Sequence, residues 1–143
     1  MIQSGQAEIP IFIVEDHDAV RGMLGKLIAR APGLVLCGEA ASAEAALAQI
    51  STCNPRLVLV DVSLPGKDGI ELIRLLHERD PDLLTLAISG HDETIYAEAA
   101  LQAGARGYIM KGKLTKVAEA IRHVCNGGIY VNEAMRDAHD DMA

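Results

Sequence analysis

Side chains that suit phosphoryl chemistry stand directly after four short apolar runs of this 143-residue chain. They are Glu15 and Asp16, Asp61, Ser89, and Lys111. A carboxylate can attack phosphorus in line to form an acyl phosphate, and further carboxylates can hold a divalent cation. A lysine supplies a point charge suited to phosphate, and a serine hydroxyl can donate a hydrogen bond to it. The set predicts metal-assisted phosphoryl chemistry, provided that the fold brings these residues together.

Five apolar runs, rich in branched residues, have the length of β-strands. They are Ile9–Val14, Leu34–Ala40, Leu57–Val60, Leu83–Ile88 and Gly107–Met110. The run Leu57–Val60 shows no polar alternation, which is typical of a strand covered on both faces in a parallel sheet.

Segments with helical spacing follow each of these runs. They are Val20–Ile28, Ser42–Ile50, Ile70–His77, Thr94–Gly104 and Thr115–Gly127. Ser42 is the predicted N-cap of the second helix, because a serine hydroxyl can accept a hydrogen bond from a free N–H of the first turn. A Pro65-Gly66 turn precedes the third helix, and Gly104 is placed to end the fourth.

Five strands that alternate with five helices predict an α/β fold with a parallel sheet and right-handed crossovers. The chain is too short for a six-stranded dinucleotide-binding domain, and no GxGxxG motif follows the first run. We therefore predict a flavodoxin-like, doubly wound five-stranded parallel sheet with the order 2-1-3-4-5. In that order ligands bind beyond the carboxyl ends of strands 1 and 3, where Glu15, Asp16 and Asp61 converge.

The convergence of three carboxylates predicts a bound cation. Two carboxylates about 5 Å apart repel by roughly 3 kcal/mol at an effective dielectric of about 20. A cation compensates this repulsion, and hard oxygen ligands with room left for phosphate favour Mg²⁺ over zinc or copper.

The composition argues against several other classes of protein. The chain has 13 Lys and Arg against 20 Asp and Glu, a net charge of −7, one Phe, three Tyr and no Trp. An acidic chain with few aromatic residues is poorly suited to bind nucleic acid directly. Three widely spaced cysteines without a CxxC pair predict neither a disulfide framework nor a zinc site. Without a membrane-length apolar run or a signal-peptide pattern, we expect a cytoplasmic protein that does not contact membranes.

Four segments of the chain resemble the motifs of one known family. They are Val14–His17, Asp61–Gly69, Ser89-Gly90 and Gly107–Lys111. At this joint spacing they are similar to the motifs of response-regulator receiver domains in two-component signalling, and the likeness covers roughly residues 9–128. The resemblance implies the same 2-1-3-4-5 strand order.

The resemblance also implies a role for each site residue. Asp61 is the expected phosphoacceptor, with Lys111 and Ser89 contacting the phosphoryl group. The expected Mg²⁺ ligands are Glu15, Asp16, Asp61 and the backbone carbonyl of Ser63. Tyr108, three residues before Lys111, is the expected switch aromatic, whose ring fills the space that Ser89 leaves when it moves toward the phosphate; a half-buried Tyr with its hydroxyl in water is the alternative. Ser63 and His91 occupy positions that tune the lifetime of the phosphorylated state in the family.

Two features depart from, or qualify, the family pattern. Gly112 stands where many receivers have proline, so we expect a looser or differently routed loop there. We predict a receiver domain over residues 8–128 and a C-terminal tail or truncated linker over 129–143, without an output domain. The exit Gly127–Val131 resembles that of receivers that continue into a helix-turn-helix DNA-binding domain.

The predicted function is a phosphorylation-dependent signalling switch. The implied partner is a sensor histidine kinase or a phosphotransfer protein, and a homodimer is a further expectation. Self-catalysed phosphoryl transfer and autodephosphorylation are the only expected reactions, so the chain is not predicted to be an enzyme. One alternative is a pseudo-receiver that acts as a phosphate-independent docking or dimerisation module. The other is an Asp-nucleophile phosphohydrolase, although such enzymes usually carry a second Asp where this chain has Ser63.

Overall fold

The computed structural model describes residues 8–64, 69–90 and 94–131, and the structural statements below concern these residues. The Pro65-Gly66 turn and His91, both named in the sequence analysis, lie outside the described residues.

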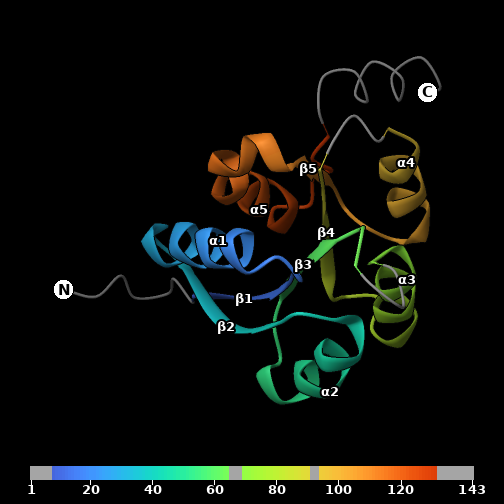
Figure 1. Cartoon of the computed structure of the whole chain (residues 1–143), viewed down its shortest axis with the longest axis horizontal. Helices are drawn as coiled ribbons and strands as arrows, with labels where there is room; N and C mark the ends of the chain where they lie inside the picture. Colours follow the sequence, from blue (N-terminus) through green and yellow to red (C-terminus); the bar gives the residue numbers. More distant parts are fainter. Residues whose placement is uncertain (1–7, 65–68, 91–93, 132–143) are drawn as a thin grey trace.

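Strands and α-helices alternate along the described chain, with a 3-10 helix before the last α-helix (Figure 1). The strands are β1 (Ile9–Val14), β2 (Leu34–Ala40), β3 (Leu57–Asp61), β4 (Leu84–Ser89) and β5 (Tyr108–Met110). The helices are α1 (Asp18–Arg30), α2 (Ala43–Cys53), α3 (Gly69–Arg79), α4 (Thr94–Ala103), the 3-10 helix η1 (Lys111–Lys116) and α5 (Val117–Cys125).

The strands form one parallel sheet in the order β2-β1-β3-β4-β5. Helices α1 and α5 cover one face, and α2, α3 and α4 cover the other (Figure 1). The central strand β3 is buried on both sides: Val58 and Val60 belong to one core cluster, and Leu57 and Leu59 to the other. This double burial is the reason for its unbroken apolar run, and the predicted doubly wound fold and strand order are confirmed.

Two strands extend further than predicted, toward the site. β3 includes Asp61, and β4 runs through Ser89. Both polar residues therefore belong to the hydrogen-bonded sheet, in which Asp61 pairs with Ile88 and Ser89 pairs with Met110. A rigid element, rather than a loop, holds each of them.

The prediction of one continuous fifth helix from Thr115 is wrong. Residues Lys111–Lys116 form η1, Lys113 has non-helical dihedrals (φ −125°, ψ 34°), and α5 begins only at Val117. Leu114 and Val117 are both buried and three residues apart, a spacing that 3-10 and α-helices share. The loop at Gly112 is therefore routed as a tight helical turn.

Helix α2 begins as predicted at its N-cap. The Ser42 hydroxyl accepts a hydrogen bond from the backbone N–H of Ala45 at 3.1 Å. The helix continues one turn past Ile50 and ends at Asn54, whose φ of 52° places it in the left-handed region. Asn tolerates this conformation better than most residues.

The segment after α5 packs against β5. The N–H of Tyr108 donates to the carbonyl of Tyr130 at 2.8 Å, and the N–H of Tyr130 donates to the carbonyl of Arg106 at 3.0 Å. Val131 is buried in the same core cluster as Tyr108. Tyr130 of the predicted tail thus forms an isolated parallel bridge with Gly107 beside β5, and the division of the chain at residue 128 stays a prediction.

Cys37, Cys53 and Cys125 are free, partly buried thiols. Within the described part of the chain, every helix is too short or too polar to cross a lipid bilayer.

Replacing the cap residue tests the local structure of α2. Ser42→Ala is expected to lower the free energy of unfolding by about 1 kcal/mol, because the Ala45 N–H loses its acceptor. Urea denaturation measures the change. Ser51→Ala makes the same chemical change at an exposed position inside the same helix. Equal losses in both variants would contradict a capping role for Ser42.

Candidate functional site

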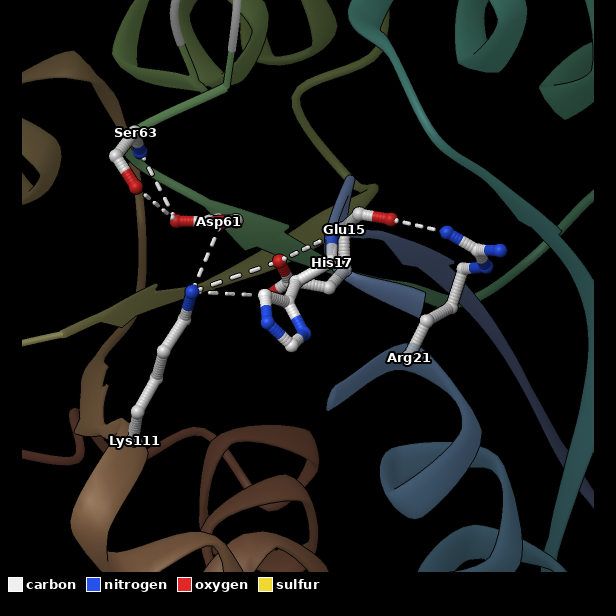
Figure 2. Close-up of polar contacts among 6 residues, drawn as sticks. All are labelled: Glu15, His17, Arg21, Asp61, Ser63 and Lys111. Carbon is white, nitrogen blue, oxygen red and sulfur yellow. Dashed lines mark hydrogen bonds and ion pairs between the residues drawn. The ribbon is translucent and has the colours of Figure 1, made fainter. Parts of the chain in front are cut away.

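The carboxyl ends of three strands bring the predicted site residues together (Figure 2). Val14 and Val60 pair directly in the parallel register, so the residues that follow them, Glu15 and Asp61, lie side by side. Lys111 follows β5, two strands away from β3, and reaches back to both carboxylates.

Asp61 is buried and held from two directions. Its Oδ1 accepts hydrogen bonds from the backbone N–H and the hydroxyl of Ser63, both at 2.9 Å. Its Oδ2 lies 3.1 Å from the Lys111 ammonium. Burial by itself raises the pKa of Asp61, but hydrogen bonds from Glu15 and Ser63 and the charge of Lys111 outweigh burial, so the pKa lies below its ordinary value. Asp61 is therefore ionised at neutral pH.

The pKa of Glu15 is shifted in the opposite direction to that of Asp61. Its side chain is fully buried, and burial, with a hydrogen bond to Asp61 next in importance, raises its pKa from 4.5 to about 7. The backbone N–H of His17, 3.1 Å from Oε2, and the charge of Lys111 counteract this rise only in part. Of the two buried carboxyl groups, Asp61 therefore loses its proton first as the pH rises.

Lys111 supplies the positive charge of the site. Its stem lies near Gly90, the residue after β4, and its ammonium lies 3.1 Å from Asp61 and 3.4 Å from Glu15. Burial by itself lowers the pKa of Lys111, but the hydrogen bond and charge of Asp61, with Glu15, raise it above the ordinary value. The ammonium therefore remains protonated between the two carboxyl groups.

The acidic side chains fit a hard divalent cation. Glu15, Asp16 and Asp61 each offer an oxygen, and these atoms lie within 4.8 Å of one another. Oε1 of Glu15 is buried and accepts no hydrogen bond from the described residues, although Lys111 lies 3.4 Å away. A buried carboxylate oxygen without a donor has an unmet need for a positive partner, and all-oxygen ligands suit Mg²⁺.

The remaining predicted residues that the structure describes are Ser89, Tyr108 and Ser63. Ser89 is fully buried at the end of β4. Tyr108 is 2% exposed, so the alternative of a half-buried ring with its hydroxyl in water is wrong. The side chain of Ser63 is exposed but bonds Asp61. The predicted roles of all these residues stay predictions.

Two residues near the site were missed as positioning elements by sequence reasoning. Gly69 begins α3 directly against β3, so that a Cβ there would fall on the Asp61 carbonyl oxygen and 2.7 Å from the Val62 Cα. Its place in the Asp61–Gly69 motif was the available signal. Arg21 donates from α1 to the backbone of Glu15, a contact that local spacing does not reveal.

Comparison with known proteins gives the same fold and family. The family model of the response regulator receiver domain matches residues 11–122. Response regulator GacA of Pseudomonas protegens is 37% identical over 125 residues, covering 87% of this chain and 59% of the relative. The activator DevR/DosR of Mycobacterium tuberculosis is 37% identical over 120 residues, covering 83% of this chain and 55% of the relative.

Solved structures agree. A LuxR-family two-component response regulator from Aurantimonas sp. SI85-9A1 superposes with a TM-score of 0.86 at 29% identity, covering 96% of this chain and 100% of that one. The signal receiver domain of the response regulator NarL of Mycobacterium tuberculosis gives a TM-score of 0.79 at 27% identity, covering 85% of this chain and 98% of that one.

These matches, together with the sheet order and the strand-end residues, show that the chain belongs to the response regulator receiver domain family of two-component systems. Response regulators are signalling proteins rather than classical enzymes. The chain spans 59% or less of the length of the curated relatives named above.

The raised pKa of Glu15 predicts the pH dependence of stability in the metal-free protein. The folded state binds the proton of Glu15 more tightly than the unfolded state, so this group makes the folded protein less stable as pH rises from about 4.5 to about 7. The lowered pKa of Asp61 affects stability only at lower pH, because Asp61 ceases to stabilise the folded state only when its carboxylate is protonated.

Urea denaturation in EDTA at pH 5, 6, 7 and 8 measures the effect. Glu15→Gln removes the titrating group, so the stability of the wild type relative to this variant is expected to fall across the window, by on the order of 3 kcal/mol at most. A difference independent of pH would contradict the assignment.

The contact of Gly69 with β3 predicts that this position tolerates no side chain. Gly69→Ala is expected to cost roughly 1 to 3 kcal/mol of stability, because the methyl group meets the rigid backbone of Asp61 and Val62. Gly22→Ala is the control, since its Cβ meets nothing within 4 Å in helix α1. The control is expected to be as stable as the wild type or more so. Thermal unfolding of both variants measures the two changes in stability. A Gly69→Ala variant as stable as the wild type would refute the contact.

Proposed function

We propose that this receiver domain takes a phosphoryl group onto Asp61 from a histidine kinase or phosphotransfer protein and uses the resulting change of surface as a signal. An Asp61 carboxylate oxygen forms the new bond to phosphorus. The bond from phosphorus to the donor imidazole nitrogen breaks, and its electron pair leaves with that nitrogen.

The observation that carries the proposal is the place of the buried Asp61 carboxylate at the switch point of the sheet, hydrogen-bonded by Ser63 and 3.1 Å from the Lys111 ammonium. The pKa of Asp61 is lowered despite burial, by hydrogen bonds from Glu15 and Ser63 and by the charge of Lys111, whereas burial raises the pKa of Glu15 to about 7. A nucleophile must be ionised and oriented, and these contacts provide both conditions. Ser63 and Lys111 are partly or fully exposed, so the phosphoryl donor has a side from which to approach.

The other residues of the site are suited to the incoming charge. Mg²⁺ held by Glu15, Asp16, Asp61 and the Ser63 carbonyl would withdraw charge from the phosphoryl oxygens. Lys111 would follow the charge from Asp61 to the phosphoryl group, and Ser89 would donate its hydroxyl to a phosphoryl oxygen. Ser63, with His91, would tune the lifetime of the acyl phosphate.

The route of the signal runs through β5. Phosphorylation adds roughly −1.5 to −2 charges, which would draw Ser89 toward the phosphate and change the packing of Tyr108. The N–H of Tyr108 donates to the carbonyl of Tyr130, and Val131 shares its core cluster. A shift of Tyr108 would therefore move the segment by which the described chain leaves the domain.

The partners follow from the family. A histidine kinase or phosphotransfer protein would dock near α1 and the loop after β5, and a homodimer would form through α1 and α5 or through the face around β5. The relative DegU of Brevibacillus brevis is named a transcriptional regulatory protein, and DevR/DosR a DNA-binding transcriptional activator. We propose a transcriptional output, exerted by other parts or partners and not by direct binding of nucleic acid to residues 8–131.

Intact-mass spectrometry after incubation with acetyl phosphate and Mg²⁺ tests the proposal. The wild type is expected to gain one phosphoryl group, and Asp61→Asn and an EDTA-treated sample none. Asp80→Asn is the matched control, because Asp80 is an exposed carboxylate just after α3, outside the candidate site. It should be labelled like the wild type.

Each failure has a distinct meaning. Labelling of Asp61→Asn equal to the wild type would place the acceptor elsewhere. No labelling of the wild type, together with no binding of beryllofluoride, would make the chain a phosphate-independent docking module. Turnover of an added phosphomonoester would favour the phosphohydrolase, although Ser63 bonds Asp61 where such enzymes usually have a carboxylic acid.

A further inference from the structure

We propose that Arg21 is a positioning residue for the metal-binding loop: it fixes the peptide unit that joins Glu15 to Asp16. The inference rests on the proposed function, since it assumes that these two carboxylates hold Mg²⁺. It concerns a residue of α1 that contacts neither the acceptor carboxylate nor the phosphoryl group.

The guanidinium of Arg21 makes three hydrogen bonds: to the residue after β1, to its own helix and to β2 (Figure 2 shows the one to Glu15). One nitrogen donates to the backbone carbonyl of Glu15 at 2.8 Å. The second donates to Oδ1 of Asp18 at 2.7 Å, and Nε donates to Oε1 of Glu39 at 3.0 Å. The side chain is only 19% exposed, against 89% for Asp18 and 44% for Glu39.

The bond to the Glu15 carbonyl has a particular geometric effect. This carbonyl belongs to the peptide unit between Glu15 and Asp16, whose six atoms lie close to one plane. The N–H of Glu15 is already held by the carbonyl of Ala40 at 3.0 Å, and the N–H of His17 is held by Oε2 of Glu15 at 3.1 Å. Arg21 fixes the plane between these two points, and with it the direction in which the exposed Asp16 side chain leaves the backbone.

Glu39 and Asp18 orient the guanidinium for this task. Glu39 belongs to β2, which is paired with β1 through Ile13, so the edge strand anchors the arginine to the sheet. Asp18 begins α1 and is almost fully exposed, so its ion pair contributes little energy. The planar fork of arginine can satisfy three acceptors at fixed angles, whereas a lysine ammonium, a point charge on a flexible four-carbon stem, cannot.

A positioning role and a purely electrostatic role of Arg21 predict opposite changes in Mg²⁺ affinity when Arg21 is replaced. A cation near a divalent metal site opposes metal binding by Coulomb repulsion. If Arg21 acted through its charge alone, its removal would tighten Mg²⁺ binding. If it positions the Glu15–Asp16 peptide, its removal weakens Mg²⁺ binding, because the ligand oxygens lose their preset geometry.

Mg²⁺ titration of the metal-free, full-length protein, followed through backbone amide NMR signals of Asp16 and His17, measures this without any phosphoryl donor. Arg21→Gln is expected to raise the Kd for Mg²⁺ about tenfold, and to shift the Asp16 amide signal before metal is added. Arg21→Lys keeps the charge and is expected to raise the Kd several-fold. Arg74→Gln, which removes an exposed arginine paired with Glu71 on α3, should leave the Kd unchanged.

An Arg21→Gln variant that binds Mg²⁺ as tightly as the wild type, or more tightly, would overturn the inference. Should that variant fail to fold, Arg21→Lys decides: an unchanged Kd overturns the inference, and a raised Kd supports it. Absence of Mg²⁺ binding by the wild type itself would instead count against the proposed function, and so the two failures are distinguishable.

Discussion

The structure depends on the placement of two buried carboxyl groups and one ammonium at a single edge of a parallel sheet. Glu15 and Asp61 repel each other when both are ionised, and Lys111 supplies one positive charge against their two negative charges. The sheet order makes this contact possible. β1 and β3 are neighbours, while β5 lies about 10 Å from β3, at two strand spacings. The Lys111 side chain, its 3.1 Å contact and the Asp61 side chain together bridge this gap.

Much of the fold and the site can be predicted from the sequence, because the apolar pattern within each short segment indicates its secondary structure and burial. Leu57–Val60 is apolar throughout since helices cover both faces of β3, and that pattern predicts a parallel sheet. Once the order 2-1-3-4-5 is chosen, the rule that parallel strands end at one edge brings Glu15, Asp61 and Lys111 together. No further pattern in the sequence was needed to predict that these three side chains meet.

What the sequence did not predict depends on contacts between distant segments. Arg21 bonds Glu39, eighteen residues away on another strand, and neither residue type specifies that contact. In the segment after α5, burial increases from exposed Ile129 through half-buried Tyr130 to buried Val131. These three residues are too few to identify a strand beside β5 from the sequence. The start of α5 was misplaced because Leu114 and Val117 satisfy 3-10 and α-helical spacing equally.

The same electrostatic network limits how a phosphoryl group can act as a switch. Changing a two-state equilibrium from 1:99 to 99:1 requires about 5.5 kcal/mol of differential binding, whereas a hydrogen bond to a charged group contributes roughly 1.5 to 3 kcal/mol. No single contact of the site suffices. In the proposed switch, the contacts of Lys111, Ser89 and a bound Mg²⁺ would therefore have to change together; Ser89 ends β4, and Lys111 follows β5. Tyr108 and Ser89 lie on adjacent strands, and the backbone of Tyr108 is hydrogen-bonded to that of Tyr130. A concerted change at the sheet edge could therefore reach the segment after α5 through these contacts.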